Sequence, residues 1–293
     1  MAYAKQRKCI RIFWNRQGRK VFNTNYTDCL DEHRFIIETN LSSKAVLNVG
    51  GDSIMKQYEA VIIALERMGG QATLADLNRE TMKVEGPKWT GKTPFANIRR
   101  IVQQRPEIFK VRPGLWALKS YQKKLGLVEN ADKDKSQVEQ NHAYYQGILL
   151  SIGNLRGYKT FSPNQDKNKL FVNKPLKEIR VLQEIPKFSY DAIVQRCSTV
   201  DVIWFNNRLL PNSFFEVEHS TDFQNSLIKF SDLQDFYTRM IIVTDDNRKR
   251  EFLQKIQSSV FAEITKRVDF LGYESLVKQY EMDLLRSSQV FLL

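Results

Sequence analysis

Three carboxylates stand in two neighbouring stretches of β-forming sequence in the C-terminal half of the chain. Asp201 lies in residues 198–205, and Glu216 and Glu218 lie in residues 213–221. Side chains alternate across a strand, so the two glutamates share one face while the valine between them points to the other. The polar interval between the two stretches suits a hairpin, and strand pairing would bring Asp201 beside the glutamates.

Three carboxylates gathered beside an apolar sheet repel one another, and burial penalises their charged forms. A cation relieves both costs, and hard divalent metals such as Mg²⁺ take oxygen ligands of this kind. A metal so placed polarises a phosphate ester, lowers the pKa of its bound water and stabilises a leaving oxygen. The spacing therefore predicts a magnesium site formed by Asp201, Glu216 and Glu218. Taken singly, each acid also fits an exposed charge on an edge strand.

The elements around these acids are predicted in the order helix, strand, hairpin, helix, strand. A helix beginning near residue 142 ends at 153–157 and leads into the start of a strand. Beyond the hairpin come a helix within 223–237, a strand at 240–244 and a further helix within 247–257. Helices that alternate with strands in this way place the acids on a sheet covered by helices.

Over roughly residues 139–273 this order resembles the common core of the PD-(D/E)XK nucleases, and FEVEHST followed by LIKFSDL resembles a variant seen in restriction endonucleases. The resemblance implies that Asp201 is the first acid of the motif, that Glu216 is the second, and that Mg²⁺ is the cofactor. Glu218 departs from the pattern, because it stands where a lysine is usual. It would then bind metal or take a proton from the attacking water. Alternatively, Lys229 on the following helix supplies the missing cation.

The first helix of this segment carries further polar candidates. Gln146 occupies the region from which these nucleases often supply another polar group, and His142 lies one turn earlier. We include Gln146 among the candidate catalytic residues, with an exposed helix face as the alternative for both. His219 adjoins the acids but points away from Glu218, so we interpret it as a structural histidine. No Gly-rich phosphate loop, HEXXH motif or Ser/His/Asp pattern competes with this interpretation.

The net charge of +12 lies mainly in two regions of the N-terminal half. Residues 1–20 hold seven Lys and Arg and no acid, and residues 55–118 are net +5. Clustered bases favour a polyanionic partner, because they release condensed counterions when they contact phosphates. A basic protein kept soluble by its charge is the alternative. We expect double-stranded DNA as the partner, with its backbone contacted by Arg7, Lys8, Arg11, Arg16 and Arg19.

Three helices followed by a hairpin are predicted in residues 54–120. The first helix ends at the Gly69-Gly70 pair, and the others begin at Thr73 and at Thr93-Pro94, where Thr is a favoured cap and Pro fits the first helical position. The hairpin turns at Gly114. Three helices and a two-stranded wing make a winged helix, and this order resembles the HARE-type helix-turn-helix module of some restriction endonucleases and chromatin proteins.

The third of these helices and the loop before it carry the expected contacts to bases. Arg can bond guanine bidentately and Gln can bond adenine, which suits a helix lying in the major groove. Lysines in the preceding loop suit the phosphate backbone. A solvated helix face is the alternative. The candidate DNA-binding residues here are Lys88, Lys92, Arg99, Arg100, Gln103 and Gln104.

Polar residues with little periodicity predict a linker between the two halves, and alternating residues 9–26 predict a β-hairpin at the N-terminus. The predicted fold class is α/β (α+β), with a mixed sheet flanked by helices in the nuclease-like part. The predicted segments are a basic β region at 1–53, a winged-helix DNA-binding domain at 54–120, a linker at 121–138 and a PD-(D/E)XK nuclease-like domain at 139–293.

The composition is that of a globular protein, since 42% of the 293 residues are hydrophobic. The chain has no apolar run of about 18 residues and no apolar signal-peptide core, so we expect a cytoplasmic protein without a membrane partner. Its isolated cysteines, Cys9, Cys29 and Cys197, indicate neither a disulfide framework nor a zinc cluster.

These patterns predict a Mg²⁺-dependent, site-specific endonuclease that cleaves double-stranded DNA, of the type II restriction class. We expect a homodimer, because palindromic sites reward twofold symmetry. Two alternatives remain open. The first is a sequence- or modification-reading DNA-binding protein with an inactive nuclease fold, and the missing motif lysine supports this alternative. The second is a repair or structure-specific nuclease.

Overall fold

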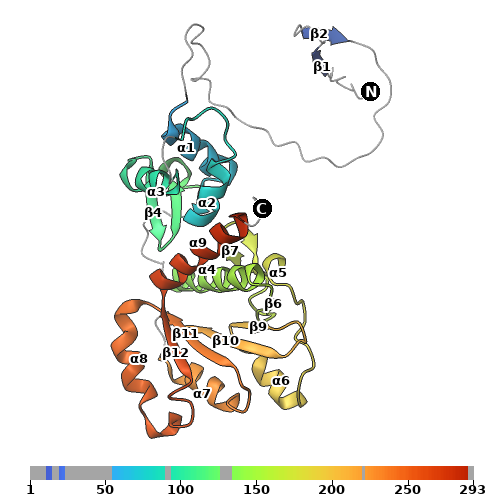
Figure 1. Cartoon of the computed structure of the whole chain (residues 1–293), viewed down its shortest axis with the longest axis vertical. Helices are drawn as coiled ribbons and strands as arrows, with labels where there is room; N and C mark the ends of the chain where they lie inside the picture. Colours follow the sequence, from blue (N-terminus) through green and yellow to red (C-terminus); the bar gives the residue numbers. More distant parts are fainter. Residues whose placement is uncertain are drawn as a thin grey trace, which may run out of the picture. The chain divides into compact units, whose positions relative to one another are not determined.

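The computed structural model describes residues 11–14, 20–23, 55–89, 94–125, 134–219 and 222–289 (Figure 1). The chain divides into two units, Met1–Asp52 and Ser53–Leu293. In the first unit, β1 (Arg11–Trp14) and β2 (Lys20–Asn23) pair in antiparallel fashion. This pairing confirms the hairpin predicted in the basic N-terminal segment.

The described part of residues 55–125 forms three α-helices and a three-stranded antiparallel sheet. The helices and hairpin occur where the sequence predicts them, and a short additional strand before the second helix completes the sheet. Thr73 caps that helix by accepting a hydrogen bond from the backbone N–H of Asp76. The elements are α1 (Gln57–Arg67), β3 (Gln71–Thr73), α2 (Leu74–Thr81), α3 (Pro94–Gln104), β4 (Ile108–Arg112) and β5 (Leu115–Leu118).

Residues 134–289 are built on a five-stranded mixed sheet with strand order β12-β11-β10-β9-β6. The pairs β6–β9 and β9–β10 are antiparallel, whereas β10–β11 and β11–β12 are parallel. The predicted mixed sheet is therefore present. Its strands are β6 (Lys159–Phe161), β9 (Val202–Phe205), β10 (Pro211–Val217), β11 (Arg239–Thr244) and β12 (Val268–Gly272).

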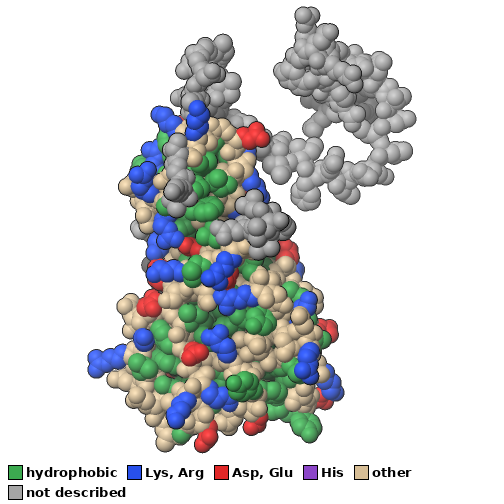
Figure 2. All heavy atoms as spheres, viewed as in Figure 1, with side chains coloured by type: hydrophobic (Ala, Val, Ile, Leu, Met, Phe, Trp, Pro, Cys, Tyr) green, Lys and Arg blue, Asp and Glu red, His purple; other side chains and the backbone are tan. Residues whose placement is uncertain are grey.

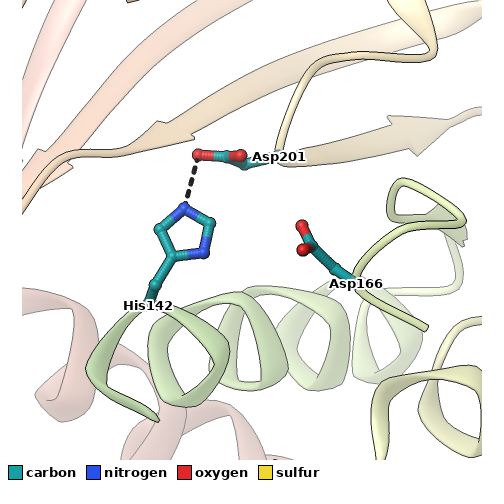
Figure 3. A group of neighbouring side chains, drawn as sticks. All are labelled: His142, Asp166 and Asp201. Atoms are coloured by element: carbon teal, nitrogen blue, oxygen red, sulfur yellow. Dashed lines mark hydrogen bonds and ion pairs between the residues drawn. The ribbon is translucent and has the colours of Figure 1, made fainter. Parts of the chain in front are cut away.

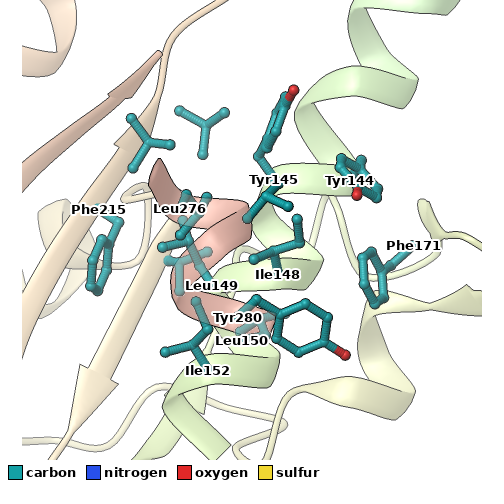
Figure 4. Packing of buried hydrophobic residues seen from close by; sticks show 14 of the residues in the cluster. Tyr144, Tyr145, Ile148, Leu149, Leu150, Ile152, Phe171, Phe215, Leu276 and Tyr280 are labelled. Atoms are coloured by element: carbon teal, nitrogen blue, oxygen red, sulfur yellow. The ribbon is translucent and has the colours of Figure 1, made fainter. Parts of the chain in front are cut away.

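Helices cover both faces of this sheet (Figure 1). One face packs against α4 (Asp134–Leu155) and α9 (Tyr273–Gln289), as Figure 4 shows. The other packs against α6 (Asp191–Cys197), α7 (Gln224–Asp232) and α8 (Lys249–Ile256). Shorter elements are β7 (Leu170–Phe171), β8 (Lys174–Pro175), α5 (Leu176–Ile179) and the 3₁₀ turns η1 (Lys119–Tyr121), η2 (Asp246–Arg248) and η3 (Ser259–Phe261). None of the helices in the described residues is both long and apolar enough to cross a bilayer.

Strand alternation explains why the sheet has two apolar faces. Phe215 and Val217 of β10 belong to the cluster with α4 and α9, whereas Phe214 belongs to the cluster with α7 and α8. Glu216 stands between Phe215 and Val217 and therefore takes the α7 side. The period of two in the sequence thus decides which helices surround each acid.

Residues 55–125 have an apolar core of their own, and a few of their side chains also join the core between the sheet and α4 within the second unit. Ala75 of α2 and Leu115 of β5 are buried in the same cluster as Tyr144, Val277 and Tyr280. Moreover, α4 already begins at Asp134, inside the predicted linker 121–138. The polar residues at the start of α4 show no apolar period, although they belong to the same helix as the buried turns that follow. The predicted domains 54–120 and 139–293 thus lie within the one unit Ser53–Leu293 and contact each other through the buried side chains of that cluster.

Candidate active site

Asp201 lies directly before β9, at the end of the sheet where β10 carries Glu216. The two strands pair with Val202 opposite Phe215, so Asp201 falls beside Glu216. One carboxylate oxygen of Asp201, Oδ2, accepts a 2.8 Å hydrogen bond from the backbone N–H of Val217. The hairpin that the sequence predicts for the two strands is confirmed, and it fixes the Asp201 side chain to the neighbouring strand.

Glu216 and Glu218 both contact α7. The hydroxyl of Ser226 donates to Oε2 of Glu216 at 3.1 Å and also to Oε1 of Glu218. Nζ of Lys229 donates to the two carboxylate oxygens of Glu216 at 3.0 and 2.8 Å, and to the carbonyl of Thr199 at 3.0 Å. Lys229 therefore reaches back from the helix to the acid, which is the geometry expected if it replaces the missing motif lysine.

A second group of side chains meets Asp201 from the α4 side (Figure 3). Nε2 of His142 lies 3.0 Å from Oδ2 of Asp201, and Asp166 points toward both from the loop after β6. One ligand-type atom from each of the three residues lies within 4.8 Å of the others. Gln146, one turn further along α4, donates from Nε2 to Oδ2 of Asp166 at 2.9 Å and to the carbonyl of Asp201 at 3.2 Å.

The close group differs from the set that the sequence predicts. Within the described residues, His142, Asp166 and Asp201 meet the 4.8 Å spacing, whereas Asp201, Glu216 and Glu218 are not brought together as such a trio. The reason is that the Asp201 carboxylate turns toward α4, while the glutamates share Ser226 on the α7 side.

Sequence reasoning did not single out Asp166, and it placed His142 only as a neighbour of Gln146. Asp166 lies in a polar loop among lysines, where nothing in the residue types distinguishes it from a solvated charge. Its burial was the missing signal, because only 3% of this residue is exposed. Gln146, for which the sequence leaves open a catalytic role or an exposed helix face, is fully buried and donates to the Asp166 carboxylate and the Asp201 carbonyl.

The charges of the site are strongly coupled. Burial alone would raise the pKa of Asp201, but the charge of His142, the hydrogen bond from it, the charge of Lys229 and the Val217 N–H lower that pKa below its ordinary value. Burial, reinforced by the charge of Asp201, raises the pKa of Glu216 well above its ordinary value, even though Lys229 and Ser226 oppose the shift. A second negative charge beside Asp201 is therefore costly, and a cation would offset that cost.

The acids raise the pKa values of the two basic groups of the site, His142 and Lys229. Burial acts to lower the pKa of His142, but the charge of Asp201, the hydrogen bond to it and the charge of Asp166 raise it above its ordinary value. Burial likewise acts to lower the pKa of Lys229, and the carboxylates of Glu216 and Asp201 raise it. Both cations are thus stabilised in their charged forms by the acids they contact.

The residues present fit a divalent cation. The site offers carboxylate oxygens and an imidazole nitrogen, which are the ligand types that such ions take. Among the residues that the structure describes, two buried polar atoms of the site lack a hydrogen-bond partner, Nδ1 of His142 and Oε1 of Gln146. Unsatisfied buried polar atoms are uncommon, and a bound cation is one kind of partner that satisfies an acceptor atom of this kind.

His219 contacts the opposite side of the sheet from the glutamates. Its Nε2 lies 3.4 Å from the amide nitrogen of Asn141, and its Nδ1 lies 3.5 Å from the hydroxyl of Tyr273. Burial and the charge of Arg248 lower its pKa. These contacts agree with its interpretation as a structural histidine.

The structure describes the side chains of some candidate DNA-binding residues and not of others. Lys and Arg side chains lie on the visible face of both residues 55–125 and residues 134–289 (Figure 2). Arg99 forms an ion pair with Glu281 of α9. The side chains of Lys88, Arg100, Gln103 and Gln104 are exposed. The side chain of Arg11 and the residues Arg7, Lys8, Arg16, Arg19 and Lys92 lie outside the description.

The segment that holds the site is the one that matches known proteins. The family model for the C-terminal domain of the type II restriction enzyme NmeDI matches residues 126–290. The type II restriction enzyme NmeDI of Neisseria meningitidis serogroup C is 25% identical over 159 residues, which are 51% of this chain and 45% of that enzyme. The chain thus covers less than half of this relative, and no solved structure shows a significant match. Because the family match takes in more than half of its residues, the chain belongs to the family defined by the C-terminal domain of the type II restriction enzyme NmeDI.

Proposed function

We propose that the chain is a metal-dependent endonuclease that cleaves double-stranded DNA at specific sites, in the manner of a type II restriction enzyme. The observation that carries the proposal is the arrangement of Asp201 and Glu216 on paired strands with Lys229 bonded to Glu216. Membership of a restriction enzyme family supports the same reaction. The shared segment covers only 45% of the named relative. That this chain has the activity of the whole relative is therefore part of the proposal.

The order of elements supports two finer assignments. The sequence α4, β6, β9, β10, α7 and β11 follows the order expected of a PD-(D/E)XK nuclease. The sequence α1, α2, α3 and the β4–β5 hairpin follows that of a winged helix, with β5 as the strand between β3 and β4. We therefore assign cleavage to residues 134–289 and DNA binding to residues 55–125 together with the basic N-terminal segment.

Mg²⁺ is the cofactor we assign to the carboxylates. Asp201 and Glu216 would hold it, and Glu218 would either join them or accept a proton from the attacking water. When bound, such a cation polarises the phosphate and makes water a better nucleophile. Glu216 is buried close to Asp201, where its carboxylate could serve as an oxygen ligand. The ammonium group of Lys229, which is hydrogen-bonded to Glu216, favours the ionised form of that acid.

Lys229 would stabilise charge that develops on the phosphate. Its three N–H donors are all bonded to Glu216 and Thr199, so it would act on the phosphate through its positive charge. Gln146 takes a positioning role, since its amide joins Asp166 to the backbone of Asp201.

Base reading is assigned to the exposed side chains of α3. The side chains of Arg100, Gln103 and Gln104 are exposed. Arginine can bond guanine and glutamine can bond adenine, so these residues could distinguish the two bases. Arg99 would have to leave Glu281 before it could contact a base. A homodimer would suit a palindromic site.

Digestion of plasmid DNA tests the proposal. Purified protein with Mg²⁺ should give discrete fragments, and chelation of the metal should stop the reaction. Asp201→Asn and Glu216→Gln should lose cleavage by at least about 100-fold while retaining DNA affinity. A uniform smear would instead favour a non-specific nuclease. Intact plasmid with Mg²⁺, in the presence of demonstrated DNA binding, would reject cleavage altogether.

A further inference from the structure

We propose that His142, Asp166 and Asp201 form a second cation site that takes a first-row transition-metal dication such as Mn²⁺ in preference to Mg²⁺ or Ca²⁺. The three residues come from α4, from the loop after β6 and from the start of β9, and Figure 3 shows them pointing toward one another. This proposal deepens the proposed function, and any effect of the second ion on DNA cleavage rests on that function. Binding of the ion can be measured without cleavage.

Burial makes this group different from a chance cluster of surface charges. Asp166 is 3% exposed, and the side chains of His142 and Asp201 are 22% and 13% exposed. Their ligand atoms lie within 4.8 Å of one another, a spacing that one ion can bridge with small side-chain rotations. The site is thus partly enclosed by α4 and the strand ends.

Gln146 gives independent support for a ligand at this position. It is fully buried, its amide faces Asp166 and Asp201, and its Oε1 has no hydrogen-bond partner among the described residues. Rotation of the terminal amide by half a turn exchanges its oxygen and nitrogen at almost no steric cost. The rotation would exchange the two hydrogen bonds that Nε2 donates for an oxygen beside the Asp166 carboxylate and the Asp201 carbonyl, and a cation there would provide the partner that Oε1 lacks.

A bound metal ion would displace two cations from this group, the proton that the acids stabilise on His142 and the ammonium group of Lys169. Lys169 contacts Oδ1 of Asp166 at 2.7 Å, but its side chain is 35% exposed and can turn into solvent. His142 contacts only one oxygen of Asp201, so the other oxygen can serve the Glu216 side of the site. Asp201 could therefore contribute one carboxylate oxygen to each of the two proposed sites.

The imidazole sets the metal preference. Mg²⁺ and Ca²⁺ favour sites made only of oxygen atoms, whereas imidazole nitrogen suits transition metals. Two carboxylates with one imidazole also suit Mn²⁺, which accepts oxygen ligands readily. This composition separates the second site from the carboxylate-only set of Asp201, Glu216 and Glu218.

Titration of Mn²⁺ into the DNA-free full chain tests the site, with unbound Mn²⁺ followed by electron paramagnetic resonance. Wild-type protein should bind Mn²⁺ in the presence of excess Mg²⁺, and His142→Gln should weaken this binding by more than about 10-fold. His219→Gln is the matched control and should bind as wild type does. Glu216→Gln should retain the Mg²⁺-resistant binding. Melting temperatures would establish that each variant is folded, and Asp166→Asn provides a second variant.

The outcomes separate the site from the reaction. If His142→Gln and Asp166→Asn bind Mn²⁺ like the wild type, or if equal Mg²⁺ displaces all bound Mn²⁺, the second site does not exist, whatever the plasmid assay shows. If Mg²⁺-resistant binding is lost in both variants, the site stands. In that case, failure to cut DNA with either metal would reject the proposed function alone.

Discussion

Lys229 lies where the removal of one charge should change the chemistry more than the fold. Its Nζ contacts both carboxylate oxygens of Glu216, which is only 2% exposed. Without that cation the pKa of Glu216, already raised by burial and by the charge of Asp201, would rise further. The acid would then be protonated over more of the working pH range and would lose its value as a metal ligand.

We expect Lys229→Met to lower the single-turnover cleavage rate by about 100-fold or more, because it removes both the charge that acts on the phosphate and the partner of Glu216. DNA affinity should change little, since the assigned DNA contacts lie elsewhere. The measurement is a quenched cleavage time course together with the melting temperature. A rate within a few-fold of wild type, in a folded variant, would remove Lys229 from the mechanism.

His142 gives a prediction about stability and pH in the absence of metal. Its folded-state pKa is raised because the charge of Asp201 and the hydrogen bond to it outweigh burial. The stabilisation is fully present below the unfolded pKa and is lost as the pH rises through the folded pKa. In chelator, the unfolding free energy of wild type should therefore exceed that of His142→Gln more at about pH 5.5 than at about pH 8.5. Urea titrations at the two pH values measure this, and a difference that grows with pH would contradict the assigned ion pair.

The residues of the site differ in how far sequence alone could predict them. The common face of Glu216 and Glu218 follows from the period of a strand, and both glutamates contact Ser226. The reach of Lys229 follows from its place on the next helix. Asp166 could not be predicted, because its position depends on the path of a loop rather than on any repeat. The ion pair of Arg99 with Glu281 joins residues 182 positions apart, which no local pattern reveals.

Among the elements, the β4–β5 turn packs closely against its neighbours. Gly114 has φ +74° in that turn, and a side chain there would overlap Val277 of α9. Tyr144 of α4 also donates a hydrogen bond to the carbonyl of Pro113 beside it. The turn therefore combines a backbone conformation that favours glycine with close packing against two helices.

We expect Gly114→Ala to destabilise the protein by well over about 1 kcal/mol, because backbone strain and overlap with Val277 add. Gly157→Ala is the matched control: its φ is +80°, and no heavy atom lies within 4 Å of an added Cβ. That variant should lose only the backbone cost of about 1 kcal/mol. Urea unfolding measures both values. Equal losses would show that packing against α9 contributes nothing at this turn.

Elements with local signals were predictable, and elements that depend on distant partners were not. Thr73 and Pro94 mark helix starts through capping chemistry, and α2 and α3 begin there. The start of α4 at Asp134 was missed because its first residues carry no apolar period. The two-residue strands β7 and β8 were missed for a similar reason, since strands this short leave no alternation to detect.

At the scale of the whole molecule, the second unit should unfold as one body. Residues 55–125 have their own core, but Ala75 and Leu115 are buried against Tyr144, Val277 and Tyr280 of α4 and α9. The polar stretch 121–138 predicts a linker, but its composition does not reveal that Ala75 and Leu115 pack against α4 and α9.

Removal of residues 1–130 should therefore lower the stability of the remainder, because it exposes the apolar side chains of α4 and α9 that face α2 and β5. We expect one cooperative thermal transition for the full second unit. The fragment 131–293 should melt at least several degrees lower or aggregate. Differential scanning calorimetry makes the comparison. Two separate transitions in the intact protein, with an unchanged melting temperature for the fragment, would show two independent domains.

The hairpin that carries Asp201 and Glu216 also sets an order of assembly for the site. Asp201 and Val217, which it hydrogen-bonds, are 16 positions apart, whereas His142 and Asp201 are 59 positions apart. Contacts between near neighbours close faster than distant ones, since the entropy cost of loop closure is smaller. The strand-borne acids should thus be paired early in folding, while α4 supplies its imidazole and amide late. A chain still being synthesised or refolded would hold an unfinished reaction centre until α4 has docked on the sheet.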